Sequence, residues 1–112
     1  MKILVSESLD EAGLSLLRDF TQVDVIKNLS EQELCAIIGE YDALVVRSRT
    51  QVTEAVISAG SRLRVVARAG TGVDNIDVDA ATRRGIMVVN APSGNNNAVA
   101  EHTMGLILAL AR

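Results

Sequence analysis

Two arginines and a pair of glycines carry the clearest chemistry in this sequence. Arg47 follows the apolar run 43–46, Arg68 follows the run 65–67, and the turn Gly70-Thr71-Gly72 comes shortly after Arg68. Glycines let a backbone approach a ligand closely with its N–H groups turned toward negative charge, and a guanidinium can hold a carboxylate or phosphate through two hydrogen bonds. The pattern indicates an anion-binding turn. The same spacing also fits a tight turn beside solvated arginines, and the residue types leave both interpretations open.

The turn does not match a dinucleotide-binding loop. The pattern G-x-G-x-x-G requires a third glycine where this sequence has Asn75, and an acidic residue at the end of the next strand where it has Asn90. Residues 74–76 also separate Gly72 from the next predicted helix, and no G-x-x-x-x-G-K-[ST] loop is present. The sequence therefore predicts that this chain does not hold a dinucleotide by itself.

The elements that must position these residues alternate along the chain. Apolar runs predict strands at 2–5, 23–26, 43–46, 65–67 and 86–89, and Asp24 in the second run indicates an edge position. Helical spacing fills the intervals, with Phe20 expected on the buried face of the first helix, and a last helix is expected over 98–112. The expected N-terminal caps are Ser8 with Glu11, Ser30 with Glu33, Thr53 and Asp77, and the expected helix ends are Gly39, Gly60 and Gly85.

This alternation predicts an α/β three-layer sandwich with a mainly parallel five-stranded sheet. The connections are too long for hairpins and fit crossover helices. In such sheets ligands bind beyond the carboxyl ends of the strands. That rule selects the residues that follow the five predicted strands, which are Ser6, Lys27, Arg47, Arg68 and Asn90.

Composition and charge exclude several classes of protein. The chain has 112 residues, 48% of them hydrophobic, with one Tyr, one Phe and no Trp. Residues 1–46 carry three basic and nine acidic side chains, whereas residues 47–84 carry seven arginines and four acidic side chains. Mild positive charge without aromatic residues fits a small anionic ligand better than nucleic acid. No apolar run reaches membrane-spanning length. Cys35 is the single cysteine and is expected in the core, so the sequence has no disulfide framework. A protein without disulfides is expected in the cytoplasm.

Three stretches resemble the D-isomer-specific 2-hydroxyacid dehydrogenases: VVRSRTQVT, LRVVARAGTGVDNIDVDAATRRGIMVVNAPSGNN and AEHTMGLILALAR. The resemblance implies a flavodoxin-like substrate domain in an NAD-dependent oxidoreductase. By resemblance, Arg47 and Ser48 hold the phosphate end of a small anionic substrate. Gly70, Thr71 and Gly72 receive its carboxylate, with Arg68 shaping that turn. Thr71 also touches the nicotinamide side of NAD, and Asn90 lies at the hinge between domains.

The resemblance also implies two parts in this chain. Residues 1–97 are expected to be the N-terminal portion of the substrate domain, and residues 98–112 to begin a linker helix that leads into a Rossmann NAD-binding domain. The family's G-x-G-x-x-G motif and its catalytic Arg, Glu and His have no counterpart here, so the chain alone is expected to be inactive and to hold no metal. His102 and Glu101 lie in the linker helix and are not expected to be catalytic.

The last helix and three alternatives complete the expectations. After Thr103 every residue up to Ala111 is apolar or glycine, and a helix that is apolar all round needs burial on all sides, which predicts a homo-oligomer formed through this helix. The first alternative is a family member whose substrate is a different 2-hydroxy acid from the one with a phosphate end. A receiver-like signalling domain is disfavoured because Arg47, not Asp, ends the third strand. A pure interaction module remains the last alternative.

Overall fold

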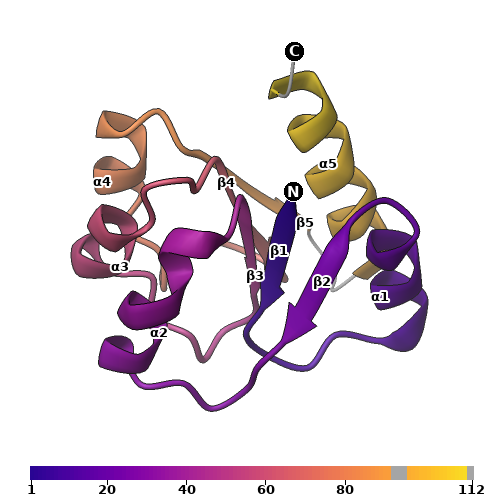
Figure 1. Cartoon of the computed structure of the whole chain (residues 1–112), viewed down its shortest axis with the longest axis horizontal. Coiled ribbons are helices and arrows are strands. Elements are labelled where there is room, and N and C mark those ends of the chain that lie inside the picture. Colours follow the sequence, from indigo (N-terminus) through magenta and orange to yellow (C-terminus); the bar gives the residue numbers. More distant parts are fainter. Residues whose placement is uncertain (92–95, 111–112) are drawn as a thin grey trace.

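A single parallel sheet organises the computed structural model, which describes residues 1–91 and 96–110 (Figure 1). Its strands lie in the order β2-β1-β3-β4-β5, and every neighbouring pair is parallel. The strands are β1 (Lys2–Val5), β2 (Gln22–Val25), β3 (Ala43–Val46), β4 (Val65–Ala69) and β5 (Met87–Ala91). This order is that of flavodoxin-like sheets. The predicted α/β class is confirmed, and β2 lies at an edge as Asp24 indicated.

Helices cover both faces of the sheet. In Figure 1 the helices α2, α3 and α4 lie on one side, and α1 and α5 lie on the other, where α5 packs on α1, β4 and β5. The bounds are α1 (Glu11–Arg18), α2 (Glu31–Ile37), the 3₁₀ helix η1 (Ile38–Glu40), α3 (Glu54–Ala59), α4 (Val78–Arg83) and α5 (Asn96–Leu110). The predicted three-layer sandwich is therefore confirmed.

Alternate residues of the strands supply two aliphatic cores. Leu4, Leu44 and Val66 pack toward α2, α3 and α4. Ile3 and Val45, with their neighbours in register, pack toward α1 and α5. Because a parallel sheet is buried on both faces, its strands read as nearly continuous runs of Val, Ile, Leu and Ala. That burial holds the carboxyl ends of the strands in fixed positions.

Three of the four predicted N-terminal caps are present. Ser30 and Glu33 form a capping box, and the side chains of Thr53 and Asp77 accept hydrogen bonds from the first turns of α3 and α4. The fourth was wrong: α1 begins at Glu11 and its cap is Asp10, which accepts a hydrogen bond from Gly13 N–H at 2.9 Å. Ser8 lies too far ahead of that first turn to act as its cap.

Other boundaries also differ from the predicted ones. Phe20 is 59% exposed, because α1 ends at Arg18 and the chain turns before this side chain reaches the core. Gly39 lies inside η1 rather than ending α2, whereas Gly60 follows the last residue of α3 as predicted. Gly85 follows α4 with φ 71°, the left-handed conformation expected beyond a helix end.

The strands β4 and β5 run further than predicted. Arg68 and Asn90 are therefore the last but one residues of their strands, paired in register, rather than residues that follow them. The last helix, α5, begins at Asn96, two residues before the predicted start at 98. Residues 92–95 and 111–112 lie outside the described ranges, so the predicted extension of this helix to 112 is not described. Within residues 1–91 and 96–110, no helix combines the length and the apolar character needed to cross a bilayer.

Candidate functional site

Glu7 holds the loop that follows β3. Its carboxylate accepts hydrogen bonds from the backbone N–H groups of Arg47 at 2.6 Å, Arg49 at 3.0 Å and Thr50 at 3.1 Å. The Ser6 and Thr50 hydroxyls are also 2.8 Å apart. Residues 47–50 therefore wrap around a carboxylate that belongs to the protein itself.

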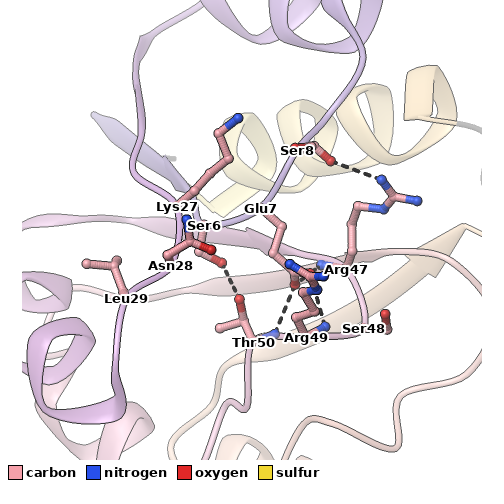
Figure 2. Close-up of a pocket in the computed structure, with 10 residues that line it drawn as sticks. All are labelled: Ser6, Glu7, Ser8, Lys27, Asn28, Leu29, Arg47, Ser48, Arg49 and Thr50. Carbon is pink, nitrogen blue, oxygen red and sulfur yellow. Dashed lines mark hydrogen bonds between the residues drawn. The ribbon is translucent and has the colours of Figure 1, made fainter.

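A cleft of about 380 Å³ opens between this loop and the ends of β1 and β2 (Figure 2). Three cationic side chains line it, and Glu7 is its only carboxylate among the described residues. Arg47 Nη1 donates to the Ser8 carbonyl at 3.4 Å, and Arg47 is an exposed residue. The lining residues are Ser6, Glu7, Ser8, Lys27, Asn28, Leu29, Arg47, Ser48, Arg49 and Thr50. With three cations and one anion, the cleft fits an anionic ligand.

Asn75 connects this loop to the glycine turn. The side chain is buried, with 6% exposed, and its Nδ2 donates to the carbonyls of Arg47 at 2.7 Å and Thr50 at 2.8 Å. Its Oδ1 accepts a hydrogen bond from Arg68 Nη1 at 2.7 Å. The Asn75 amide thus donates hydrogen bonds to the 47–50 loop and accepts one from Arg68 in β4.

Arg68 is an anchor of the turn rather than a solvated side chain. Its side chain is 12% exposed, and its Nη1 also donates to the Asp74 carboxylate. Hydrogen bonding to Arg68 is the largest cause that holds the Asp74 pKa below its ordinary value. Among the described side chains, Arg68 Nε is the buried polar atom that has no hydrogen-bond partner. These contacts hold Arg68 against the residues that follow the glycine turn.

The glycine turn adopts backbone conformations that favour glycine. Gly70 has φ 155° and Gly72 has φ 79°. The Asn90 Nδ2 donates to the Gly70 carbonyl at 3.3 Å, so the end of β5 supports the turn. Thr71 and Gly72 are exposed. The turn therefore presents its backbone at the carboxyl edge of the sheet, one strand away from the cleft.

The structure brings the selected residues to the carboxyl ends of the strands, and the two residues not expected to be catalytic lie elsewhere. Arg47 and Ser48 line the cleft, and Lys27 lines it too although Ile26 separates it from β2. Glu101 and His102 are exposed on α5 and do not line the cleft. Among residues 1–91 and 96–110, no group of His, Cys, Asp or Glu could hold a metal ion.

Sequence reasoning missed Glu7, Arg49 and the bridging role of Asn75. Arg49 had a usable signal, since it lies two residues after Arg47 beyond the same strand. Asn75 was noticed only as a residue that breaks a glycine motif. Its partners lie 25 and 28 residues away in the chain, so no local pattern could assign them.

The dinucleotide motif is also absent in three dimensions. Asn75 stands where the third glycine would allow a helix to pack closely, and α4 begins only at Val78. The turn is therefore not the start of a phosphate-binding helix.

Comparison with known proteins places this geometry in a family. The family model described as D-isomer specific 2-hydroxyacid dehydrogenase, catalytic domain, matches residues 3–105. The D-3-phosphoglycerate dehydrogenase of Synechocystis sp. is 56% identical over 111 residues, which are 99% of this chain and 20% of that protein. The same-named protein of Methanocaldococcus jannaschii is 51% identical over 112 residues, which are all of this chain and 21% of that protein. The chain thus spans about a fifth of the length of these relatives.

Solved structures agree with this placement. A protein from Pyrococcus horikoshii OT3 superposes with a TM-score of 0.80 at 36% identity, covering 97% of this chain and 33% of that one. The 3-phosphoglycerate dehydrogenase of Entamoeba histolytica, solved with bound NAD+, superposes with a TM-score of 0.75 at 31% identity, covering 96% and 38%. The resemblance stated from the sequence is confirmed, and the chain belongs to the D-isomer-specific 2-hydroxyacid dehydrogenases.

Proposed function

We propose that this chain is the substrate-binding portion of an NAD-dependent D-3-phosphoglycerate dehydrogenase of L-serine biosynthesis. The observation that carries the proposal is the pair of anion-binding features at one sheet edge, the cationic cleft and the glycine turn, joined through Asn75. A substrate with a phosphate at one end and a carboxylate at the other matches two such features. The names of relatives that are 51–56% identical support the same substrate.

The residues of this chain orient the substrate. Arg47, Ser48 and Arg49 bind its phosphate end, where guanidinium groups form charge-assisted hydrogen bonds. The backbone of Gly70, Thr71 and Gly72 receives its carboxylate, while Arg68 holds the turn. Fixing both ends places C2 and its hydroxyl in one orientation, which lowers the entropic part of the barrier.

The cofactor of the proposed enzyme is NAD, which when bound would accept the hydride that C2 loses as D-3-phosphoglycerate becomes 3-phosphohydroxypyruvate. The described residues do not form a dinucleotide site, because Asn75 occupies the third-glycine position and commits its amide to the neighbouring loop. Thr71, exposed in the turn, is the proposed contact to the nicotinamide side. The rest of NAD, and the groups that move the proton, belong to a further domain.

The remaining proposals concern the assembly of the protein. Residues 1–97 form the substrate-domain portion, residues 98–112 are part of the segment that leads to the NAD-binding domain, and Asn90 lies at the hinge between them. The enzyme is a cytoplasmic homo-oligomer in which α5 contributes to the interface. The apolar sequence of α5 and the single cysteine support these statements.

The test is an amide NMR titration of the chain with D-3-phosphoglycerate, D-lactate and NAD, each added separately. We expect the amides of Ser48, Gly70 and Gly72 to shift with phosphoglycerate and not with lactate, since lactate lacks the phosphate end. The variant Arg47→Ala should weaken that response about tenfold or more, because it removes a charge-assisted contact. Equal shifts with lactate would favour a different 2-hydroxy acid, the alternative within the same family. No shift at these amides with any of the three ligands would contradict the proposed binding by this segment.

A further inference from the structure

We propose that Glu7 and Asn75 are positioning residues that hold the 47–50 loop from its two sides and so fix the separation between the two anion-binding features. The inference rests on the proposed function, because it assumes a ligand that spans the cleft and the glycine turn. It adds that the site selects ligands by length. A ligand with an anionic group at each end binds well only while the braced loop keeps the cleft and the glycine turn at the matching distance.

Glu7 supplies the brace on the N–H side. Its two carboxylate oxygens accept three backbone N–H groups of the loop, at 2.6, 3.0 and 3.1 Å. Convergent backbone N–H groups are an anion-binding arrangement, and here the protein's own carboxylate fills it. An incoming phosphate therefore meets the side chains of Arg47, Ser48 and Arg49, because the amides of residues 47, 49 and 50 already donate to Glu7. In Figure 2 the Glu7 side chain points toward this loop, and dashed lines mark its hydrogen bonds there.

Asn75 supplies the brace on the carbonyl side. Its Nδ2 donates to the carbonyls at the first and last residues of the loop, Arg47 and Thr50. Its Oδ1 accepts from Arg68 in β4, which also holds Asp74 beyond the glycine turn. Only a side-chain amide offers two donors and an acceptor in one plane, so neither Asp nor Leu could replace it. The amide is buried, which makes each of these hydrogen bonds costly to lose.

The two braces form one continuous connection from the glycine turn to the cleft. It runs from Arg68 through Asn75 to the 47–50 loop and ends at Glu7. A shift of about 1 Å in a positioned group is enough to cost a large factor in binding or rate. Loss of either brace is therefore expected to affect ligands that use both ends more than ligands that use one.

The experiment compares two ligands on the 112-residue chain and its variants. D-3-phosphoglycerate uses both ends, whereas inorganic phosphate uses one. For Asn75→Asp and Asn75→Ala we expect phosphoglycerate affinity to fall about tenfold or more and phosphate affinity to change less than about twofold. The two variants differ in charge, so agreement between them assigns the effect to the lost donors. Glu7→Gln removes a negative charge from the cleft and so favours both anions, but it should still lower phosphoglycerate affinity relative to phosphate affinity. Glu54→Gln removes the same charge from an exposed partner of Arg83 and is the matched control, which should leave the ratio of the two affinities unchanged.

A second readout needs no ligand. Amide hydrogen exchange at Thr50 should accelerate in Asn75→Asp and Glu7→Gln, while the Ser6 N–H, which donates to the Val45 carbonyl in the sheet, stays protected. Equal weakening of both ligands, or unchanged Thr50 exchange, would overturn the proposal, since a merely structural role changes the stability of the whole fold. If the unmodified chain binds neither ligand, the proposed function and the selection by length both fail, and the exchange at Thr50 still decides whether the braces exist.

Discussion

At the scale of single residues, Glu7 is the charge on which the candidate site depends. Burial of the carboxyl raises its pKa, and hydrogen bonds from the backbone N–H groups of Thr50, Arg47 and Arg49 and from the Thr50 side chain together lower it by more. The net pKa therefore lies below the ordinary value. The ionised form of Glu7 is the form that holds the loop, which links the order of the loop to pH.

The order of the loop should persist at neutral pH and be lost in acid. A group whose pKa is lowered by folding contributes stability above its unfolded pKa, and that contribution disappears as the pH falls through the folded value. We expect the Thr50 amide resonance to stay constant from pH 7 down to the ordinary Glu pKa of 4.5 and to move only below it. Glu7→Gln should lack this transition. A midpoint at or above 4.5 would contradict the arrangement of hydrogen bonds around Glu7.

Tyr41 should respond at the opposite end of the pH scale. Burial, and then the hydrogen bond that its hydroxyl donates to Asp24 at 2.7 Å, raise the pKa of Tyr41 to about 12. A raised pKa stabilises the fold fully below the unfolded value of 10.0, and that stabilisation is lost as the pH rises toward 12. Tyr41→Phe should lower the free energy of unfolding by about 1 kcal/mol at pH 7. Urea unfolding at pH 7 and pH 11 should find the variant closer to the unmodified chain at pH 11, and an equal gap at both pH values would refute this.

At the scale of elements, the glycine turn between β4 and α4 combines a backbone conformation that favours glycine with a proposed role in ligand binding. Gly72 has φ 79°, and a Cβ built there would lie 3.8 Å from the Asp74 carboxylate, so space is not the obstacle. The left-handed backbone itself disfavours a side chain. Gly85 beyond α4 has nearly the same conformation, φ 71°, with no atom within 4 Å of such a Cβ. The two glycines therefore differ in their place in the fold and not in their local strain.

Alanine variants of Gly72 and Gly85 distinguish a loss of stability caused by backbone strain from a loss of ligand binding. Gly72→Ala and Gly85→Ala should each lower the free energy of unfolding by about 1 kcal/mol, because both place alanine in a left-handed conformation. Only Gly72→Ala should also weaken the binding of D-3-phosphoglycerate. Gly85 precedes β5 and so lies at the amino ends of the strands, away from the carboxyl ends where the candidate site lies. Urea unfolding gives the first quantity and the NMR titration the second. Equal loss of binding in both variants would show that stability alone controls the site.

At the scale of the whole molecule, α5 is the element through which we propose that the chain associates. Ala100 and Thr103 are buried against the rest of the fold, whereas Glu101, His102, Gly105 and Ala109 are exposed. The sheet and α1 thus cover one side of this helix. From Ala98 to Leu110 its polar side chains are Glu101, His102 and Thr103. An apolar helix covered on one side favours self-association.

The chain should therefore be larger than a monomer in solution. Light scattering at tens of micromolar should give a mass above the 11.9 kDa of one chain. Ala109→Asp should reduce that mass by placing a charge on the exposed side of α5. Ala55→Asp, at an exposed position of α3 in the opposite layer, is the matched control and should leave the mass unchanged. A monomer at these concentrations would remove the support for an interface formed through α5.

The sequence by itself determined the layers, the parallel sheet, the edge position of β2 and the glycine turn. These depend on the spacing of apolar residues, on connection lengths and on residues such as Gly72, all of which are local properties of the chain. The positions of Arg47 and Ser48 at the sheet edge follow from the same rules. The cap of α1 was misjudged because Ser8 and Asp10 both offer an oxygen, and only the path of the chain after β1 selects Asp10.

Only the tertiary structure decided what holds the candidate site together. Glu7 and the loop it braces are separated by about 40 residues, and Asn75 reaches carbonyls 25 and 28 residues away. Such hydrogen bonds form because parallel strands bring the ends of distant segments to one edge, where buried polar groups must find partners. Residue types showed which groups could bind an anion, and the packing of the sheet determined which of them instead bind one another.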